Sequence, residues 1–262
     1  MGRLGSLAGV CAAVLALSAA PASAGAAPKS VLKSEDRLSA LYAQGIARID
    51  KGWILTGRFV IDRVNEKFKP IVDNRRPIPQ NLLAQGYNHV GDIDVVGKYI
   101  YAPLEQGNYD LGHQITARYN LRTLKFIDYV VLPQHENSFV TVDPKTMIAY
   151  TMDHFDGNTI LRYDVRKKWR VLAPLQMDMT LQHTQGGDVA DGAIWIQSSD
   201  PQNSTWRVDL HTGHADLLGS SGHVPGEGEG IDATKLKSGR LHTLTVDPNI
   251  NPVWLGHFAV VG

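Results

Sequence analysis

Three short segments, Arg118-Tyr119-Asn120-Leu121, Arg162-Tyr163-Asp164-Val165 and Arg207-Val208-Asp209-Leu210, repeat one another at a nearly constant distance. Their first residues lie 44 positions (118 to 162) and 45 positions (162 to 207) apart. A polar, turn-prone stretch and then an apolar run follow each segment. A period of about 40 to 50 residues with this strand–turn–strand texture is typical of a β-propeller blade, so the repeat indicates a propeller.

A second repeat lies earlier in each unit. It begins with a short inner strand, continues through a tight turn that carries Asp, Gly or Pro, and ends in a second, apolar strand. Its five copies span residues 45–55, 91–101, 139–150, 186–196 and 230–244. The first repeat then supplies third strands, and runs at 126–132 and 170–175 supply fourth strands. The sequence therefore predicts an all-β fold, a five-bladed β-propeller of four-stranded blades.

The two ends of the chain are predicted to meet in the last blade. That blade has three strands of its own, ending at 253–261. Its fourth strand can come from segment 31–41, which would close the ring and cover an exposed edge. A helix over 34–42 is the alternative. The N-terminal segment is placed at 25–41 and the propeller domain at 42–262.

The first 24 residues have the features of a cleavable signal peptide. Arg3 is followed by an apolar run at 7–20 and by Ala22-Ser23-Ala24, a small-residue cleavage signal. A run of about 14 apolar residues is too short for a bilayer core, which needs about 20. We therefore expect a secreted or periplasmic protein. Cys11 is the one cysteine, so cleavage leaves no disulfide and no cysteine ligand.

The composition of the chain also limits which kinds of partner are expected. Lys and Arg together number 26, as do Asp and Glu, so the formal net charge is zero. The linear sequence shows neither the basic stripe typical of nucleic-acid binding nor a cationic amphipathic helix for a membrane surface. We expect a monomer with a small-molecule ligand or substrate in the axial funnel, without nucleic acid or membrane as a partner.

Histidine precedes the inner strand in four units, and carboxylates follow several second strands. In a propeller both kinds of position open onto one face, so these side chains are expected to converge around the axis. The candidate catalytic residues are His89, His135, His183 and His154. Convergent His, Asp and Glu side chains around one funnel are what a metal site or an acid–base site needs. For each of them the alternative is a turn cap or a link between blades.

Residues 226–230 read Gly-Glu-Gly-Glu-Gly. A phosphate loop is rejected here, because two carboxylates would repel phosphate and no helix follows. We expect the glycines to let the backbone approach the crowded axis, with Glu227 or Glu229 pointing into the channel. A flexible, exposed acidic turn is the alternative. Elsewhere, Asp143, Asp164 and Asp209 are predicted to cap turns.

The blade texture resembles the propeller group that includes gluconolactonase and regucalcin, paraoxonase and strictosidine-synthase-like proteins. The resemblance implies a divalent ion, usually calcium, held in the axial channel by Glu, Asn and Asp from separate blades, and lactonase or esterase activity. The residues of this chain with the matching chemistry, and so the candidate metal ligands, are Glu105, Asp153, Glu229, Asn88 and Asn137. Those families have six blades, and this mouth is richer in histidine than a calcium site needs. In addition, Tyr42-Ala43-Gln44-Gly45 resembles the opening strand of the plant-type glutaminyl cyclotransferases.

These observations predict a secreted, metal-dependent hydrolase of a lactone or an ester. The ion on Glu105, Asp153 and Glu229 would polarise the carbonyl. His89, His135 or a third histidine, His183, would activate water. Two alternatives stay open: a non-catalytic propeller that binds a ligand or a protein, and a glutaminyl-cyclotransferase-like enzyme that uses a pair of carboxylates.

Overall fold

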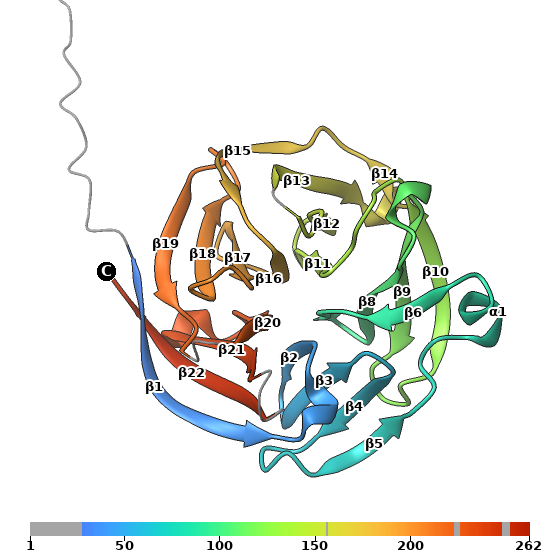
Figure 1. Cartoon of the computed structure of the whole chain (residues 1–262), viewed down its shortest axis with the longest axis horizontal. Helices are drawn as coiled ribbons and strands as arrows, with labels where there is room; N and C mark the ends of the chain where they lie inside the picture. Colours follow the sequence, from blue (N-terminus) through green and yellow to red (C-terminus); the bar gives the residue numbers. More distant parts are fainter. Residues whose placement is uncertain (1–27, 156, 223–225, 248–251) are drawn as a thin grey trace, which may run out of the picture.

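The computed structural model describes residues 28–155, 157–222, 226–247 and 252–262. Their strands form five antiparallel sheets that stand around a central axis like the blades of a propeller (Figure 1). The predicted five-bladed, all-β fold is confirmed. The predicted signal peptide at 1–24 lies outside the described residues. Among those described, no helix is long and apolar enough to cross a membrane.

The blades follow one another along the chain, each from its inner strand outward. Blade 1 contains β2 (Gly45–Ile49), β3 (Gly52–Gly57), β4 (Val60–Val64) and β5 (Pro70–Asn74). Blade 2 contains β6 (Tyr87–Val90), β7 (Asp94–Val96), β8 (Tyr99–Gln106), β9 (Gln114–Asn120) and β10 (Phe126–Leu132). Blade 3 contains β11 (Thr141–Val142), β12 (Ile148–Thr151), β13 (Gly157–Asp164), β14 (Arg170–Val171) and β15 (Leu175–Leu181).

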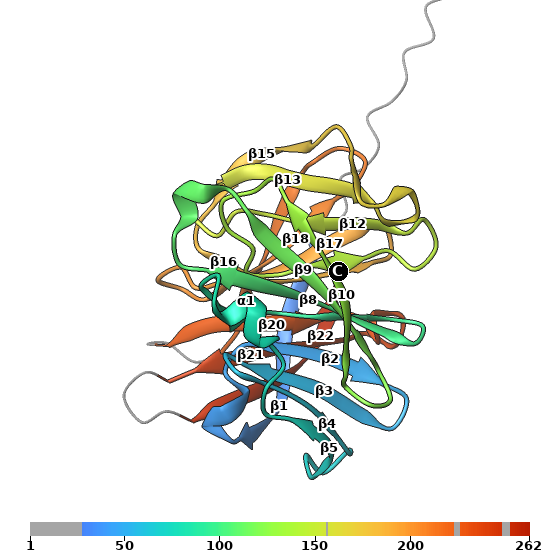
Figure 2. The same cartoon turned by 90° about the vertical axis from the view of Figure 1, so that its right-hand side faces the viewer.

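Blade 4 contains β16 (Thr184–Ala190), β17 (Ala193–Ser198), β18 (Ser204–Asp209) and β19 (Ala215–Ser220). Blade 5 contains β20 (Glu227–Asp232), β21 (Arg240–Val246), β22 (Val253–Val261) and β1 (Lys29–Leu38). The helical elements are α1 (Gln80–Leu83) and the single turns η1 (Ala40–Tyr42), η2 (Tyr109–Leu111), η3 (Val165–Lys167) and η4 (Leu236–Ser238). Seen from the side, the blades form a disc whose strands cross its thickness (Figure 2).

Two blades have an interrupted strand. In blade 2 the inner strand is split into β6 and β7, which both pair with β8, and Asp92 lies in the gap. In blade 3 the outer strand is split into β14 and β15, which both pair with β13. The single strand predicted over 170–175 is therefore wrong. Pro174 has no N–H to donate to β13, so the ladder stops before it and resumes at Leu175.

The N-terminal segment completes the last blade. β1 runs antiparallel to β22, from Lys29 opposite Val261 to Leu38 opposite Val253, so segments from the two ends of the sequence lie side by side (Figure 1). The helix considered for 34–42 is limited to the single turn η1. β1 takes the outer position of blade 5 and covers the edge of β22.

Side chains cap the turns that follow the first repeat. Asn120, Asp164 and Asp209 end the third strands of three blades. Their side-chain oxygens accept backbone N–H groups of residues two or three positions further along the chain, at 2.9–3.2 Å. Asp143 caps its turn in the same way, accepting the N–H of Lys145 at 2.8 Å. The predicted capping role of Asp143, Asp164 and Asp209 is confirmed.

The tyrosines of the first repeat pack between blades. Tyr119 and Tyr163 are buried. The Tyr119 hydroxyl donates to the carbonyl of Pro77 at 3.0 Å, and the Tyr163 hydroxyl to Oε1 of Gln134 at 3.1 Å. Pro77 and Gln134 belong to the segments that connect each blade to the one before it. Each tyrosine therefore ties its blade to the preceding connection.

Asp92 joins all five blades at the axis. Its carboxylate accepts the backbone N–H groups of Ile46 (3.0 Å), Gly187 (3.1 Å) and Ile231 (3.2 Å), which belong to blades 1, 4 and 5. Its own N–H and C=O bond to residues 138–140 of blade 3 at 2.8 and 3.4 Å. Burial raises the pKa of this carboxyl well above its usual value, and the backbone donors oppose the rise.

Three glycines permit this packing. A Cβ added at Gly45, Gly186 or Gly230 would lie 2.6–2.9 Å from atoms of Asp92, closer than carbon atoms approach in real structures. Gly230 thus has the role expected for the 226–230 segment. Backbone and the Asp92 carboxyl group therefore pack closely where the inner strands meet.

Truncation of Tyr163 tests the packing between blades. Tyr163→Ala should lower the free energy of unfolding by about 3–5 kcal/mol, because it removes a buried ring. Tyr163→Phe loses only the bond to Gln134 and should cost about 1 kcal/mol. Denaturant unfolding measures both values. A loss below about 1 kcal/mol for Tyr163→Ala would show that the ring does not hold the blades together.

Removal of the Asp92 carboxyl tests the axis. Asp92→Ala leaves three buried backbone N–H groups without acceptors, each worth about 1–3 kcal/mol, so we expect a loss of about 3–9 kcal/mol or no folded protein. Asp188→Ala is the matched control, since Asp188 accepts one backbone N–H, that of Ala233. Thermal unfolding compares the two. Equal losses would contradict a special role for Asp92.

Candidate functional site

The two faces of the disc are formed by different connections. We define the entry face as the side where loops enter the inner strands and leave the second strands. The turn face is the opposite side, where the inner strand turns into the second strand and the third into the fourth. Because neighbouring strands in a blade are antiparallel, all connections of one kind lie on one face. The candidate site residues belong to the entry face.

His89 and Glu105 face each other across two neighbouring strands. They are paired on β6 and β8, and His89 Nδ1 lies 3.9 Å from Glu105 Oε2. Gln44 fixes the imidazole, because its amide nitrogen donates to the carbonyl of Ala43 at 2.6 Å and its oxygen therefore faces His89 Nε2. Nε2 must then carry the proton, and Nδ1 presents a lone pair toward Glu105.

The two oxygens of Glu105 have different partners. Oε1 accepts the backbone N–H of Asn137 at 2.8 Å, whereas Oε2 is turned toward His89. Burial raises the pKa of the Glu105 carboxyl, the bond from Asn137 opposes this, and the nearby Glu136 and Asp153 add to the rise. Oε2 is therefore the oxygen that is available to exchange a proton.

His89 is held in its neutral form. Burial lowers the pKa of His89 to about 4, and the positive charges of Arg58 and His154 contribute to the same shift. The side chain keeps 32 % of its surface exposed, so a substrate can reach it. At neutral pH a neutral imidazole thus stands beside a carboxyl with increased proton affinity.

Aromatic rings lie on the neighbouring loops. His154 and His183 stack with their ring centroids 5.4 Å apart, and Phe155 meets them at 4.9 and 5.9 Å. Tyr109 meets Phe155 at 6.3 Å. Phe155 is 53 % exposed, so these rings form a partly exposed aromatic rim on the entry face. His154 belongs to both groups, because its charge contributes to the pKa of His89.

Two predicted residues are engaged at the edge of this site. His135 is exposed, and its Nδ1 donates to the carbonyl of Tyr109 at 2.8 Å. Asn88 accepts from the Arg58 guanidinium through both its side-chain oxygen and its carbonyl, each at 3.2 Å. Asn88 therefore holds a cation in place of a metal.

Two further predicted residues lie deeper in the blades. Asn137 uses both ends of its amide, donating to the carbonyl of Ile115 at 2.8 Å and accepting from Thr151 at 3.1 Å. Glu229 is buried, close enough to Asp92 for the two charges to interact, and burial raises the pKa of its carboxyl well above the usual value. No bond between Glu229 and the His89–Glu105 pair is found among the described residues.

The predicted metal ligands do not gather into one site. In the part of the chain that the structure describes, no three His, Cys, Asp or Glu side chains are placed to hold a metal ion. Asp153 already accepts the N–H of Glu136 at 3.1 Å, and both ends of Asn137 are occupied. The divalent metal stays a prediction from the sequence, and this set of donors does not fit it.

A cavity of about 400 Å³ lies beside Gln44 and Arg58, which bond to His89 and Asn88. Its apolar wall includes Leu41, Phe59 and Val60, and its polar edge includes Gln44 and Arg58. Gln44 is the residue that orients His89, so the polar edge of the cavity meets the catalytic candidates. A ligand in an axial funnel stays a prediction, and this cavity, which lies against blade 1, offers a second position for a ligand.

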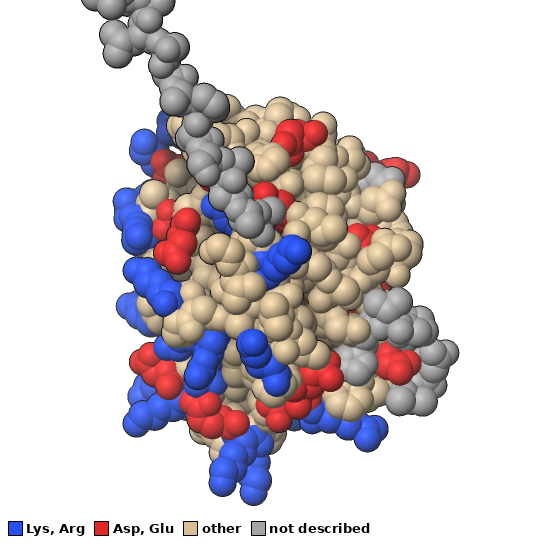
Figure 3. All heavy atoms as spheres, turned by 90° about the vertical axis from the view of Figure 1, so that its left-hand side faces the viewer, with Lys and Arg blue, Asp and Glu red and all other residues tan. Residues whose placement is uncertain are grey.

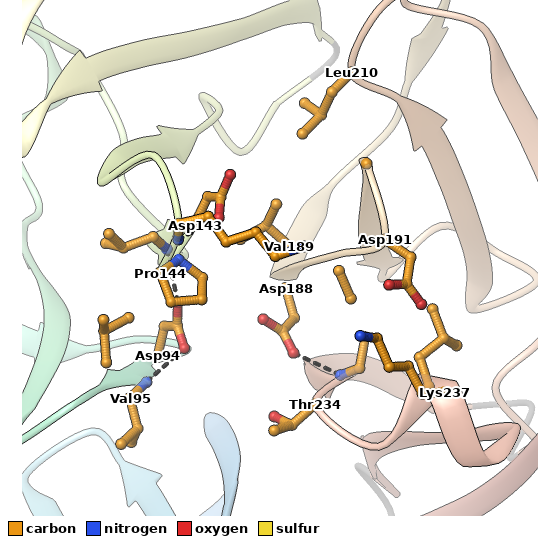
Figure 4. A pocket seen from close by; sticks show the side chains of 17 residues that line it. Asp94, Val95, Asp143, Pro144, Asp188, Val189, Asp191, Leu210, Thr234 and Lys237 are labelled. Carbon is orange, nitrogen blue, oxygen red and sulfur yellow. Dashed lines mark hydrogen bonds between the residues drawn. The ribbon is translucent and has the colours of Figure 1, made fainter.

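A second cavity, of about 240 Å³, lies on the turn face and includes Asp94 and Asp188 in its lining (Figure 4). Polar side chains of successive inner strands bond to the next blade here. The bonds run from backbone N–H groups to side-chain oxygens: Val142 to Asp94 (2.7 Å), Val189 to Thr141 (2.9 Å), Ala233 to Asp188 (2.6 Å) and Arg48 to Asp232 (3.0 Å). Burial raises the pKa of Asp94 to about 6. These carboxyls serve contacts between blades, so we interpret this cavity as part of the scaffold.

Sequence reasoning missed Tyr109 and Phe155. Tyr109 lies in the connection between the second and third strands of blade 2, several residues beyond the strand end where Glu105 was found. Phe155 follows His154 directly, and an exposed aromatic residue beside a histidine on an entry-face loop was the available signal. The orienting role of Gln44 has no signal in the sequence, because it depends on a bond to another blade.

Fold and site together define a β-propeller with a compact polar site beside an apolar cavity, an arrangement that serves both enzymes and binding proteins. No protein-family model matches the sequence, and a search of curated proteins finds no match.

Solved structures share the fold. A glutaminyl cyclase of Myxococcus xanthus is similar, with a TM-score of 0.65 and 11 % identity over 90 % of this chain and 98 % of that one. A luciferin-regenerating enzyme is similar, with a TM-score of 0.55 and 9 % identity over 84 % of this chain and 77 % of that one. At such identities the likeness shows a propeller fold that enzymes also use. The gluconolactonase-like resemblance and secretion stay predictions.

The state of His89 can be measured directly. We expect its imidazole to stay neutral at pH 6 and to take up a proton only near pH 4. Because this pKa lies below the unfolded value of about 6.5, His89 removes stability as the pH falls from about 6.5 toward 4. NMR titration of the histidine ring protons, assigned with His89→Gln, gives the midpoint. A midpoint near 6.5 would contradict the burial and tautomer described for this residue.

Proposed function

We propose that the entry face is the active site of a hydrolase that acts on a lactone or an ester, with Glu105 as general base and His89 as its proton partner. The observation that carries the proposal is the fixed opposition of the neutral His89 Nδ1 and the buried Glu105 Oε2 at 3.9 Å. Titratable groups with shifted pKa values that face each other beside a cavity are typical of catalytic sites.

The proposed reaction moves one proton from water to the leaving oxygen. The ionised Glu105 Oε2 takes a proton from water while the water oxygen bonds to the carbonyl carbon. The proton passes to His89 Nδ1 and then to the leaving alkoxide as the C–O bond breaks. Acid and alcohol are released, or a hydroxy acid from a lactone, and both side chains return to their first state. A raised pKa makes Glu105 a stronger base than an exposed carboxylate.

The cavity suggests which part of the substrate is recognised. The acyl chain or ring carbons would contact Leu41, Phe59 and Val60 in the cavity of about 400 Å³, where burial of each methylene contributes about 0.8 kcal/mol. Arg58 lies at the polar edge and is anchored by Asn88. Its positive charge would stabilise the oxyanion that forms at the carbonyl oxygen.

Cyclotransferase chemistry is the second candidate, favoured by the acidic and aromatic surroundings of Glu105. Glu136 and Asp153 interact with its charge, and Phe155 and Tyr109 stand on the rim. Such surroundings suit an ammonium group through charge and cation–π attraction. Glu105 would then carry the proton from an attacking amine to departing ammonia. A binding protein without catalysis is the third possibility.

A substrate panel separates these proposals. Aliphatic lactones and aryl esters of increasing acyl length test hydrolysis, and peptides with N-terminal glutamine test cyclisation. On the active substrate, Glu105→Gln should lower kcat by about 10²–10⁴-fold, and His89→Gln should do the same. Glu66→Gln is the matched control, because Glu66 is an exposed carboxylate in a turn at the far face, paired with Arg48.

The pH profile and metal content complete the test. As the pH falls through the raised pKa of Glu105, kcat/KM should fall, because the base must be ionised. Elemental analysis and dialysis against a chelator test the separate prediction of a divalent ion such as calcium. A wild-type rate for Glu105→Gln would refute the role of Glu105 as the general base. If no substrate of the panel is turned over, the proposal of a non-catalytic binding protein is favoured.

A further inference from the structure

The charges of the chain are separated between the two faces. We count each turn of the turn face together with the one strand residue on either side of it. These segments contain fourteen Lys and Arg residues and seven Asp and Glu residues. Of these acids, Asp232 is buried, and Asp143, Asp164 and Asp209 are turn caps. The exposed charge of the turn face is therefore strongly positive, although the whole chain has no net charge.

The entry face has the opposite composition. Its loops contain three arginines, Arg58, Arg75 and Arg76, and no lysine. Arg75 is paired with the buried Asp62 at 2.9 Å, and Arg58 is held by Asn88. Figure 3 shows the result from the side, with Lys and Arg gathered along the left edge of the disc, which is the turn face.

The cations of the turn face are exposed and largely unpaired. Lys145 and Lys237 stand at the border of the central cavity of this face, are exposed, and take part in no ion pair found among the described residues. The densest group is the turn of blade 3, where four of the five residues at 166–170 are Lys or Arg. Every blade except blade 4 contributes at least one cation, so the positive charge spreads over most of the face.

The same turns offer little apolar surface. None of the large hydrophobic residues that are exposed in the described chain falls within them. The face therefore cannot insert deeply into an apolar medium. Its aromatic residues Phe68, Tyr99, Phe126 and Trp169 are only partly exposed, so they offer little ring surface on which nucleic-acid bases would stack. Charge is therefore its main means of attracting a partner.

We propose that the turn face docks the protein on a bilayer surface of anionic phospholipids. A broad face covered mainly by lysines fits a laterally extended layer of negative headgroups, because lysine acts as a mobile point charge without fixed geometry. Nucleic acid fits less well, since the aromatic rings beside the cations are only partly exposed. Docking in this orientation leaves the His89–Glu105 pair facing the solvent.

The proposal departs from the expectation that no membrane is a partner. That expectation rested on the absence of a cationic amphipathic helix in the linear sequence. Here each turn contributes only a few cations, and the five-bladed ring brings them together. The contact is peripheral and electrostatic, and it is independent of whether the entry face is catalytic.

Vesicle binding tests the proposal with the folded protein. We expect co-sedimentation with vesicles of phosphatidylglycerol in phosphatidylcholine, no binding to phosphatidylcholine alone, and loss of binding between about 0.05 M and about 0.5 M salt. Lys145→Gln with Lys237→Gln should weaken the partition coefficient about 25-fold, because each lysine near an anionic surface contributes about fivefold.

The matched control removes the same charge elsewhere. Arg37→Gln with Arg76→Gln neutralises two exposed cations outside the turn face and should change the partition coefficient less than twofold. Thermal unfolding confirms that both double variants are folded. The proposal is overturned if the wild-type protein does not bind anionic vesicles, or if the arginine double variant weakens binding as much as the lysine double variant. It is also overturned if duplex DNA displaces the protein from vesicles at equal phosphate concentration.

Discussion

One buried carboxyl group, that of Asp92, sets the geometry of the whole ring. By accepting backbone N–H groups from three other blades and pairing its own backbone with a fourth, it fixes how closely the five inner strands approach. Glycines at 45, 186 and 230 are then required, because any Cβ there would collide with Asp92. The cavity against blade 1 lies outside this closely packed centre.

The fold could be predicted from the sequence because the constraints that build it are local and repeat. A strand, a capped turn and a second strand produce the same sequence pattern in each blade. Asn120, Asp164 and Asp209 occupy the same position in this pattern. A fourth copy of the first repeat, Arg63-Val64-Asn65, was not recognised from the sequence. It begins 55 residues before the next copy (63 to 118), since the connection holding α1 lengthens that unit. Its Asn65 also accepts N–H groups of the following turn, at 2.9 and 3.0 Å.

The site was predictable only in part, for a physical reason. His89 and Glu105 could be assigned to one face from their positions in the blade, because strand direction alone decides the face. Their chemistry depends on bonds between blades. Gln44, which selects the tautomer of His89, and the backbone of Asn137, which occupies one oxygen of Glu105, come from two other parts of the ring. No periodicity encodes such contacts. The clustering of cations on the turn face could not be predicted from the linear sequence for the same reason.

The opposite charges of the two faces act independently. Inner strands of about six residues span about 20 Å at about 3.3 Å per residue, whereas charge is screened in water within about 8 Å at physiological salt. A headgroup layer against the turn face is therefore too distant to shift the pKa of Glu105 or His89 appreciably. Attachment and proton transfer can then be altered separately by substitution, because Lys145 and Lys237 lie on the opposite face of the disc from His89 and Glu105.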